Sequence, residues 1–303
     1  MNTASFSSVV APPNRRQRAC KRSAPLMAAM FALLTWATPP LSAAPPPPAK
    51  VTLLPDMPEA QDLFAIDINN SEQIIGSYYG FDDNTYGFLY EKGAYFTLDI
   101  IPSRINNLGQ IVGTAYNSDF SVTNYLYDKG VYTSIEFPGA VENTTLVLGI
   151  NDRGQITGSY ADDQGIHGFL YEKGVYSALP DAPGAQINYA QCINNQGQAI
   201  VWAYDALGFN NFIYSRGGYS VFAAPDGTYG SYPNDINNAG QIVGVYFDSN
   251  FDTQSFAYNR GVFTSIAIPG AQFTTATGIN DLGQIVGTYY DADSLSHSFV
   301  LSR

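Results

Sequence analysis

A short phrase that recurs six times constrains the fold of this 303-residue chain more than any other feature. The phrase has the imperfect form Ile-Asn-(Asn/Asp)-x-Gly-Gln-Ile-Val-Gly. Its copies begin at Ile68, Ile105, Ile150, Ile193, Ile236 and Ile279, at spacings of 37, 45, 43, 43 and 43 residues. Self-similarity at such a period is the sequence signature of a repeat architecture. The chain after residue 50 is therefore expected to be six copies of one unit.

Each unit holds four short runs of strand length, rich in β-branched and aromatic residues and separated by turn residues. Between the first and second runs, Asn280-Asp281-Leu282-Gly283 is typical of a type I turn closed by a glycine with positive φ. Between the third and fourth, a Lys-Gly or Arg-Gly pair predicts another tight hairpin. No segment has a helical apolar period. Four antiparallel strands every 43 residues predict a β-propeller blade, and an open solenoid with capped ends is the alternative.

The two ends of the repeat region favour the closed ring. The chain stops at Arg303 after three strands of the sixth unit, while the residues from Lys50 to Pro55 resemble a fourth strand placed before the first unit. Pairing of these two ends would leave no unprotected sheet edge. We therefore predict an all-β fold: a six-bladed β-propeller of four-stranded antiparallel blades over residues 50–303, closed by the N-terminal strand completing the last blade.

A second phrase links the chain to a family. Gly87-Phe88-Leu89-Tyr90-Glu91-Lys92-Gly93 returns as Gly168 to Gly174, and the tripeptides His167-Gly168-Phe169 and His297-Ser298-Phe299 approach His-Ala-Phe. These phrases resemble the bacterial extracellular HAF-repeat family over about residues 50–303. The resemblance implies export and a repeated architecture, and it implies no reaction and no catalytic residue.

Residues 1–44 have the layout of a secretory signal peptide. A basic stretch from Arg15 to Arg22 precedes an apolar run from Ala24 to Ala37, which is shorter than the roughly 20 residues of a bilayer span. We expect cleavage near Ala43 or Ala44, export by the general secretory or the twin-arginine route, and a secreted protein, periplasmic or extracellular. Residues 45–49 form a Pro-rich spacer. Cys20 would leave with the signal, so no internal disulfide is expected.

Charge divides the predicted ring into two faces. Five of the 14 basic residues precede residue 45, so the exported part holds nine basic against 26 acidic residues, which argues against nucleic acid or an anionic membrane as partner. Six of the nine fall at the turn between the third and fourth strands, on one face. The connections on the opposite face are rich in aspartate. The basic six are Lys92, Lys129, Lys173, Arg216, Arg260 and Arg303.

The acidic face supplies most of the candidate site residues. Loop aspartates such as Asp82, Asp163 and Asp205 serve as solvated turn residues or as ligand-binding groups. Asp291 and Asp293 alternate in the manner of Ca²⁺ ligands, although the glycine and later glutamate of an EF-hand loop are missing. No other cofactor is indicated.

Two residue types add candidates for ligand binding. His167 and His297 start equivalent strands beside the acidic loops, either as hydrogen-bonded structural residues or as metal-binding or acid–base groups. Trp202 interrupts the repeat where other units have smaller residues, either through repacking or as a platform for a sugar or another ligand. The glutamine that recurs in every unit is expected to satisfy backbone groups between neighbouring blades.

The sequence thus predicts a secreted binding or scaffold module without catalytic activity. Its ligand would be an extracellular polysaccharide or protein held at the acidic face, with Ca²⁺ as an optional aid. A propeller hydrolase or lyase acting on carbohydrate or a lactone is the competing class, because the loops offer pairs of aspartates. A purely structural envelope or matrix component is the third. No phosphate-binding loop, zinc-peptidase motif or serine-hydrolase motif is present.

Overall fold

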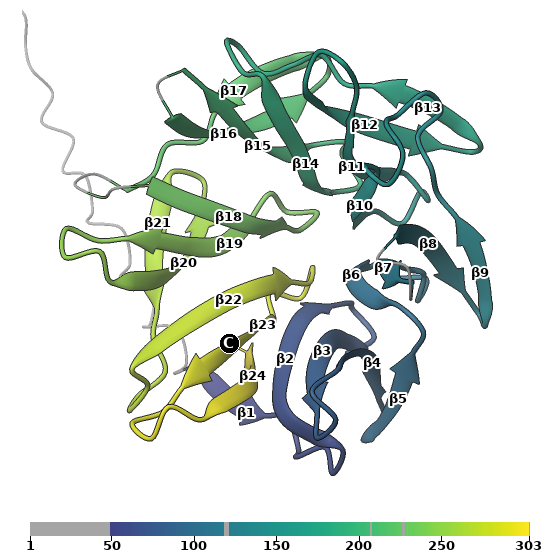
Figure 1. Ribbon diagram of the computed structural model, residues 1–303. Helices are drawn as coiled ribbons and strands as arrows, with labels where there is room; N and C mark the ends of the chain where they lie inside the picture. The colour runs from purple at the N-terminus through teal and green to yellow at the C-terminus, as the bar shows by residue number, and fades with distance from the viewer. Residues whose placement is uncertain (1–48, 118–120, 207, 226–227, 229, 303) are drawn as a thin grey trace, which may run out of the picture. The chain divides into compact units, whose positions relative to one another are not determined.

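The computed structural model describes residues 49–117, 121–206, 208–225, 228 and 230–302 as an all-β structure. Four sheets have four strands each and one sheet has eight. The sheets are arranged about a common centre (Figure 1), so the predicted β-propeller is confirmed at the level of the fold. The expected signal peptide and most of the Pro-rich spacer lie outside the described residues.

The strands follow one another in chain order within each sheet. The first sheet holds β2 (Ala60–Ile68), β3 (Ile74–Gly80), β4 (Thr85–Glu91) and β5 (Ala94–Leu98), and the second holds β6 (Ile101–Ile105), β7 (Ile111–Tyr116), β8 (Val122–Asp128) and β9 (Val131–Ser134). The eight-stranded sheet holds β10 (Leu146–Ile150), β11 (Ile156–Ala161), β12 (Ile166–Glu172), β13 (Val175–Ala178), β14 (Ile187–Ile193), β15 (Ala199–Asp205), β16 (Gly208–Ser215) and β17 (Gly218–Val221). Next come β18 (Gly230–Ile236), β19 (Ile242–Phe247), β20 (Thr253–Asn259) and β21 (Val262–Ile266), and then β22 (Phe273–Ile279), β23 (Ile285–Tyr290) and β24 (Ser296–Ser302) with β1 (Lys50–Leu53).

The number of hydrogen-bonded sheets does not equal the six blades that the sequence predicts. In the eight-stranded sheet, β12 and β14 are joined by a single parallel pair, Ile166 with Ile187, whereas every other pairing is antiparallel. The first strands of successive repeats contact one another in a closed cycle, from β2 through β6, β10, β14, β18 and β22 back to β2. These strands face the centre (Figure 1).

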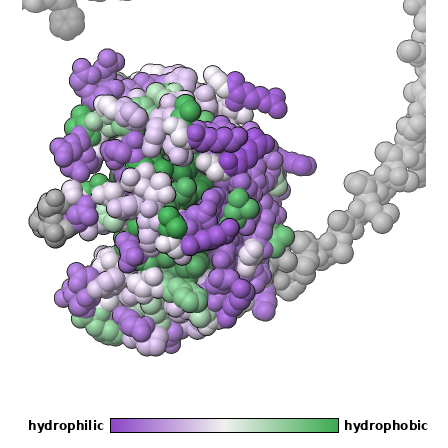
Figure 2. All heavy atoms as spheres, turned by 90° about the vertical axis from the view of Figure 1, so that its right-hand side faces the viewer, coloured by the Kyte–Doolittle hydropathy of each residue, from purple (hydrophilic) through white to green (hydrophobic). Residues whose placement is uncertain are grey.

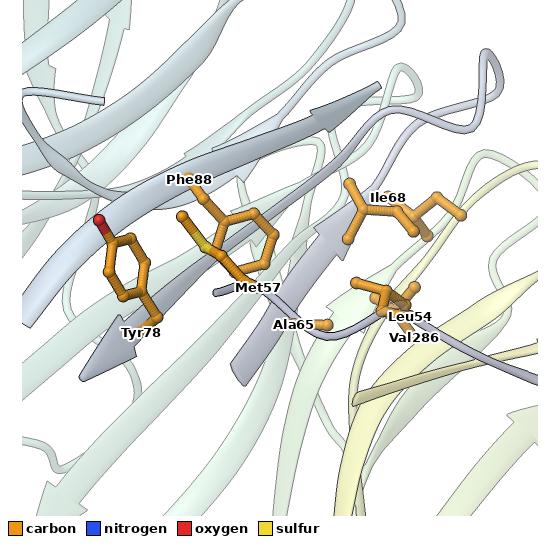
Figure 3. Close-up of a cluster of buried hydrophobic side chains, with 8 residues drawn as sticks. Leu54, Met57, Ala65, Ile68, Tyr78, Phe88 and Val286 are labelled. Carbon is orange, nitrogen blue, oxygen red and sulfur yellow. The ribbon is translucent and has the colours of Figure 1, made fainter. Parts of the chain in front are cut away.

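The N-terminal strand completes the last sheet, as the sequence predicts. β1 pairs antiparallel with β24, with Val51 opposite Leu301 and Thr52 opposite Val300. A buried cluster packs across this seam (Figure 3): Leu54 and Met57, which follow β1, lie with residues of the first sheet and with Val286 of β23. The two ends of the ring are therefore joined by strand pairing and by burial of apolar surface.

The two kinds of tight turn lie on one face, which we call the turn face. Between the third and fourth strands, both residues of each Lys-Gly or Arg-Gly pair have positive φ, for example Lys173 at 51° and Gly174 at 86°. This is the conformation of a two-residue type I′ hairpin, whose twist matches that of the flanking strands. The opposite face, called the loop face, holds the connections between second and third strands and between successive repeats.

Candidate functional site

One asparagine from each repeat closes a ring of hydrogen bonds on the turn face. In each turn after the first strand, the asparagine Nδ2 donates to the backbone oxygen of the equivalent asparagine in the next repeat, at 3.0 to 3.1 Å, and the last donates to the first. The six side chains are nearly inaccessible to solvent. They are Asn69, Asn106, Asn151, Asn194, Asn237 and Asn280.

The recurring glutamine works differently from the sequence-based expectation. Its Oε1 accepts a hydrogen bond from the asparagine Nδ2 of its own turn, as Gln198 does from Asn194 at 2.9 Å. The same contact recurs in all six repeats. The glutamine therefore orients the asparagine, and the asparagine makes the link between repeats. Sequence reasoning assigned the link to the wrong amide because both residues recur at every turn.

A second ring, one residue further along the chain, covers the same end of the space enclosed by the six first strands, which we call the channel. Each backbone N–H of this ring donates to the side-chain Oδ1 of the equivalent residue in the next repeat. Four of its members are asparagine and two, Asp152 and Asp281, are aspartate. Asn70, Asn107 and Asn238 donate to Oδ2 of Asp281. Both carboxylates thus accept amide donors from within the ring.

Beneath these rings lies a charged cluster that sequence reasoning missed. Asp67, Arg104, Cys192 and Asp235 line a cavity of about 60 Å³ together with the two rings. Arg104 Nε lies 3.6 Å from an Asp235 oxygen, and this buried Nε makes no hydrogen bond among the described residues. In the sequence, this cluster is indicated by the residue that precedes the first isoleucine of each repeated phrase. That position varies as Asp, Arg, Gly, Cys, Asp and Gly while the phrase itself recurs.

Each of the two carboxylates of the cluster accepts hydrogen bonds from its own repeat and from the next one. Asp67 accepts Ile68 N–H at 2.8 Å and, from the next repeat, Ile105 N–H at 2.9 Å. Asp235 does the same for the N–H groups of Ile236 and Ile279. Burial and the neighbouring Asp235 raise the pKa of Asp67 to about 8, and burial also raises the pKa of Asp235. One carboxyl of the pair is therefore protonated near neutral pH.

On the loop face, predicted aspartates accept hydrogen bonds from groups of their own loops. Asp82 accepts hydrogen bonds from the Tyr86 hydroxyl at 2.6 Å and from Asn84 Nδ2 at 2.8 Å, which lower its pKa to about 2. Asp205 accepts from Gly208 N–H and from Asn210 Nδ2. Asp163 is exposed at the tip of its loop. These contacts are those of solvated turn residues.

The two histidines occupy the same structural position as Tyr86 and Asn210. His167 Nε2 lies 3.1 Å from Asp162 of the preceding loop, and its Nδ1 lies 2.9 Å from Asp181 of the connection to the next repeat. Burial on its own would lower the pKa of His167, but the hydrogen bonds and charges of Asp181 and Asp162 raise it. The two histidines belong to different sheets, and no contact joins them among the described residues.

The candidate Ca²⁺ ligands Asp291 and Asp293 lie in the loop between β23 and β24. The Asp291 carboxylate accepts Asp293 N–H, Leu295 N–H and His297 Nε2 at 2.8 to 3.0 Å, contacts that lower its pKa. Within the part of the chain that the structure describes, no three His, Cys, Asp or Glu side chains are grouped as metal ligands. Ca²⁺ binding stays a prediction from the sequence.

Trp202 lies at the junction between β15 and β18. Its indole N–H donates to Pro233 O at 3.0 Å, and its ring meets the rings of Phe209 and Tyr232 edge to face at 6.0 and 5.4 Å. Tyr204, two residues further along β15, is 38% exposed and lies against Phe209. Trp202 therefore anchors an aromatic cluster whose exposed member is Tyr204.

The loop face has exposed rings, and no Lys or Arg of the described residues lies on it. Tyr79, Tyr116 and Tyr204 end the second strands of their repeats and are 48%, 72% and 38% exposed. In the side view of Figure 2, apolar residues are interspersed among hydrophilic ones. Every described Lys or Arg lies at the turn face or, for Arg104, beside the channel. They are Lys50, Lys92, Arg104, Lys129, Arg153, Lys173, Arg216 and Arg260.

Grooves recur where the third strand of one repeat meets the first strand of the next on the loop face. One lies between β20 and β22, with a volume of about 570 Å³. A second lies between β24 and β2, with about 300 Å³, and a third beside β8 and the connection that leads to β10, with about 480 Å³. Volumes of this order are typical of small-ligand sites.

Comparison with solved structures places the chain among β-propellers. It is similar to a putative TolB from Agrobacterium tumefaciens, with TM-score 0.52 and 13% identity over 83% of this chain and 96% of the other. A mutant of AofleA from Arthrobotrys oligospora gives TM-score 0.52 and 10% identity, covering 83% and 86%. TolB from Acinetobacter baumannii gives 0.51 and 9%, covering 80% of this chain but only 63% of the other. At these identities the likeness extends to the fold alone.

Comparison with protein-family models gave no match, and comparison with curated proteins gave none either. The described residues contain no helix that is long and apolar enough to cross a membrane.

Proposed function

We propose that this protein is an exported, non-catalytic binding module that takes an extracellular polysaccharide or protein ligand on its loop face. The observation that carries the proposal is the combination of exposed tyrosine rings, carboxylates and grooves on a face without a described Lys or Arg. Aromatic faces with nearby hydrogen-bonding groups suit hydroxyl-rich or mixed polar ligands. The loop carboxylates are held by bonds within their own loops, which favours binding over acid–base catalysis.

The experiment is a binding screen with a check for turnover. The purified exported part is applied to an array of polysaccharides and, separately, to extracellular protein from the producing cells. Bound polysaccharide is then recovered and sized. Retention of an intact ligand is the expected result. Shortened products that disappear in Asp162→Asn or Asp291→Asn variants would instead assign the protein to the hydrolases or lyases.

We also infer that the ring has six blades and that the eight-stranded sheet counts as two of them. The closed cycle of six asparagine bonds supports this count, because each bond links one repeat to the next. Membership of the HAF-repeat family belongs to the same proposal. A crystal structure with five or seven equivalent turns around the channel would contradict the count.

Export is proposed from residues 1–44. Recovery of the protein from periplasm or medium, with an N-terminus near Pro45, is the expected outcome of N-terminal sequencing. A cell-associated protein that retains Met1 would contradict export.

A further inference from the structure

The groove between β20 and β22 differs from the other two in its lining. Two phenylalanines, Phe251 and Phe273, border it, and the other side chains that reach it include Asp252, Gln254 and Gln272. Aromatic rings, amides and a carboxylate therefore share one hollow. No Lys or Arg is among its lining residues.

Phe251 has a backbone conformation that its side chain does not favour. Its φ is +65°, in the left-handed region, which is unfavourable for an L-residue with a bulky side chain. The equivalent loop positions with positive φ hold Asp83 and Ser294, short polar residues that tolerate this region better. The Phe251 side chain is 67% exposed. Strain of this kind concentrates at binding sites.

Phe273 offers a fixed aromatic surface in the same groove. It stacks on Tyr290 with ring centroids 4.5 Å apart and planes at 24°, and it remains 40% exposed. One face of the phenyl ring is covered by Tyr290, so the stack holds the ring in place and leaves exposed area to the groove. A ring that is already immobilised loses little conformational entropy when a ligand stacks on it.

The polar groups beside the rings are oriented by neighbouring bonds. Gln254 Nε2 donates to Asp248 at 3.1 Å, and Gln272 Nε2 donates to Ala292 O at 3.0 Å. These contacts direct the two amides while their carbonyl oxygens remain available as acceptors. Asp252 is exposed and adds a carboxylate acceptor. The groove therefore presents more acceptors than donors, which suits a ligand rich in hydroxyl groups.

We propose that the groove between β20 and β22 is a saccharide-binding site that takes a neutral oligosaccharide, stacked between Phe251 and Phe273 and hydrogen-bonded by Gln254, Gln272 and Asp252. The inference rests on the proposed binding function and specifies its ligand class. Uronic acids and sulfated sugars are disfavoured because the groove holds Asp252 and no cation.

The groove between β24 and β2 provides an internal comparison. At the chain positions equivalent to Phe251 and Phe273 stand Ser294 and Asp62, and Ser296 Oγ donates to Asp62 at 2.6 Å. The lining residues of this groove include no phenylalanine. This comparison indicates Phe251→Ser as the most informative substitution, because serine stands at that position in an equivalent loop.

The test uses three variants of the exported part: Phe251→Ser, Phe273→Leu and, as control, Phe96→Ala, which removes a 53% exposed ring on β5. The probes are neutral glucan, galactan and mannan oligosaccharides of four to six units, with oligogalacturonate as the acidic comparison. Calorimetric titration should show a neutral probe that binds about two- to tenfold more weakly to each groove variant, because each substitution removes an aromatic contact. Phe96→Ala should bind as the parent does.

Thermal melting separates binding from folding. Phe251→Ser should keep a melting temperature close to that of the parent, because the side chain is 67% exposed, and yet lose affinity. Neutral-probe binding that both groove variants retain would overturn this site and leave the proposed function standing. Tighter binding of oligogalacturonate than of every neutral probe would overturn the ligand class. Absence of binding to any saccharide would overturn the inference, while the protein arm of the earlier screen still decides the proposed function.

Discussion

At the scale of the residue, Asn194 shows how one side chain holds two repeats together. Its Oδ1 accepts the N–H groups of Gln196 and Gln198, and its Nδ2 donates to Gln198 Oε1 and to Asn237 O. The residue is 3% exposed, so no water can replace these bonds. We expect Asn194→Ala to lower the free energy of unfolding by about 4 kcal/mol, at about 1 kcal/mol for each of the four bonds.

Asn194→Asp should lower the free energy of unfolding more than Asn194→Ala does. Its second carboxylate oxygen would face Gln198 Oε1 and Asn237 O, the two oxygens that now accept hydrogen bonds from Nδ2. Urea unfolding followed by fluorescence measures both variants, with the exposed Asn250→Ala as control. An Asn194→Asp protein as stable as the parent would contradict the ring as described.

Asp67 makes a pH-dependent contribution to stability. Its pKa is raised from 3.8 to about 8 in the folded state, so the folded protein holds a proton that the unfolded chain releases. The proton on Asp67 contributes its full stabilisation of the folded state below pH 3.8, and this stabilisation is lost as the pH rises through about 8. Between pH 6 and pH 9, we therefore expect the stability of the parent to fall relative to that of Asp67→Asn, which does not titrate. Parallel melting curves across this range would contradict the raised pKa.

At the scale of the element, the Lys-Gly hairpins put two residues with positive φ next to each other. A Cβ on Gly174 would meet no atom within 4 Å, so Gly174→Ala should cost only the backbone strain of φ +86°, roughly 1 to 2 kcal/mol. Lys173→Asn should stabilise by a few tenths of a kcal/mol, because Asn-Gly is the preferred type I′ pair. Chemical denaturation of both variants tests the turn type. Equal stability of Gly174→Ala and parent would contradict it.

The same scale shows what the sequence could and could not predict. The strand order, the tight turns and the pairing of the first strand with the last follow from residue periodicity, turn chemistry and the surplus strand at Val51. The cluster of Asp67, Arg104 and Asp235 does not. Each first strand contains a register shift, as between Ala65 and Asp67, that places one extra residue in the strand. Such a bulge changes which side chains face the channel. The alternating residue pattern of a strand, with its period of two, does not reveal where a bulge occurs.

The loop carboxylates were recognised by type but not by partner. Asp162 and His167 are five residues apart in sequence, and only the closure of the loop brings Nε2 within 3.1 Å of the carboxylate. Asp181, the third member, comes from the connection to the next repeat, and pattern reasoning had no means to place it there. The sequence thus indicated loops rich in aspartate, but not that these aspartates form hydrogen bonds within their own loops.

At the scale of the whole molecule, the ring depends on the seam between β1 and β24. Four residue pairs and one apolar cluster join the ends of the described chain there. Thr52 and Val300 face each other across the seam. In the double variant Thr52→Cys, Val300→Cys, a disulfide would close a loop of roughly 250 residues, for which the chain-entropy relation gives about 5 kcal/mol of stabilisation. Opposed residues of an antiparallel pair have the separation that a disulfide requires.

We expect the oxidised double variant to melt well above the parent, and its reduced form to melt close to the parent. The comparison of oxidised with reduced protein isolates the cross-link, because the only cysteine among the described residues, Cys192, is buried and free. If the seam opens before the rest of the ring, the cross-link should also remove early loss of the far-ultraviolet strand signal during heating. A cross-link that forms and leaves the melting curve unchanged would show that the ring fails elsewhere first, and that the seam is not its weakest junction.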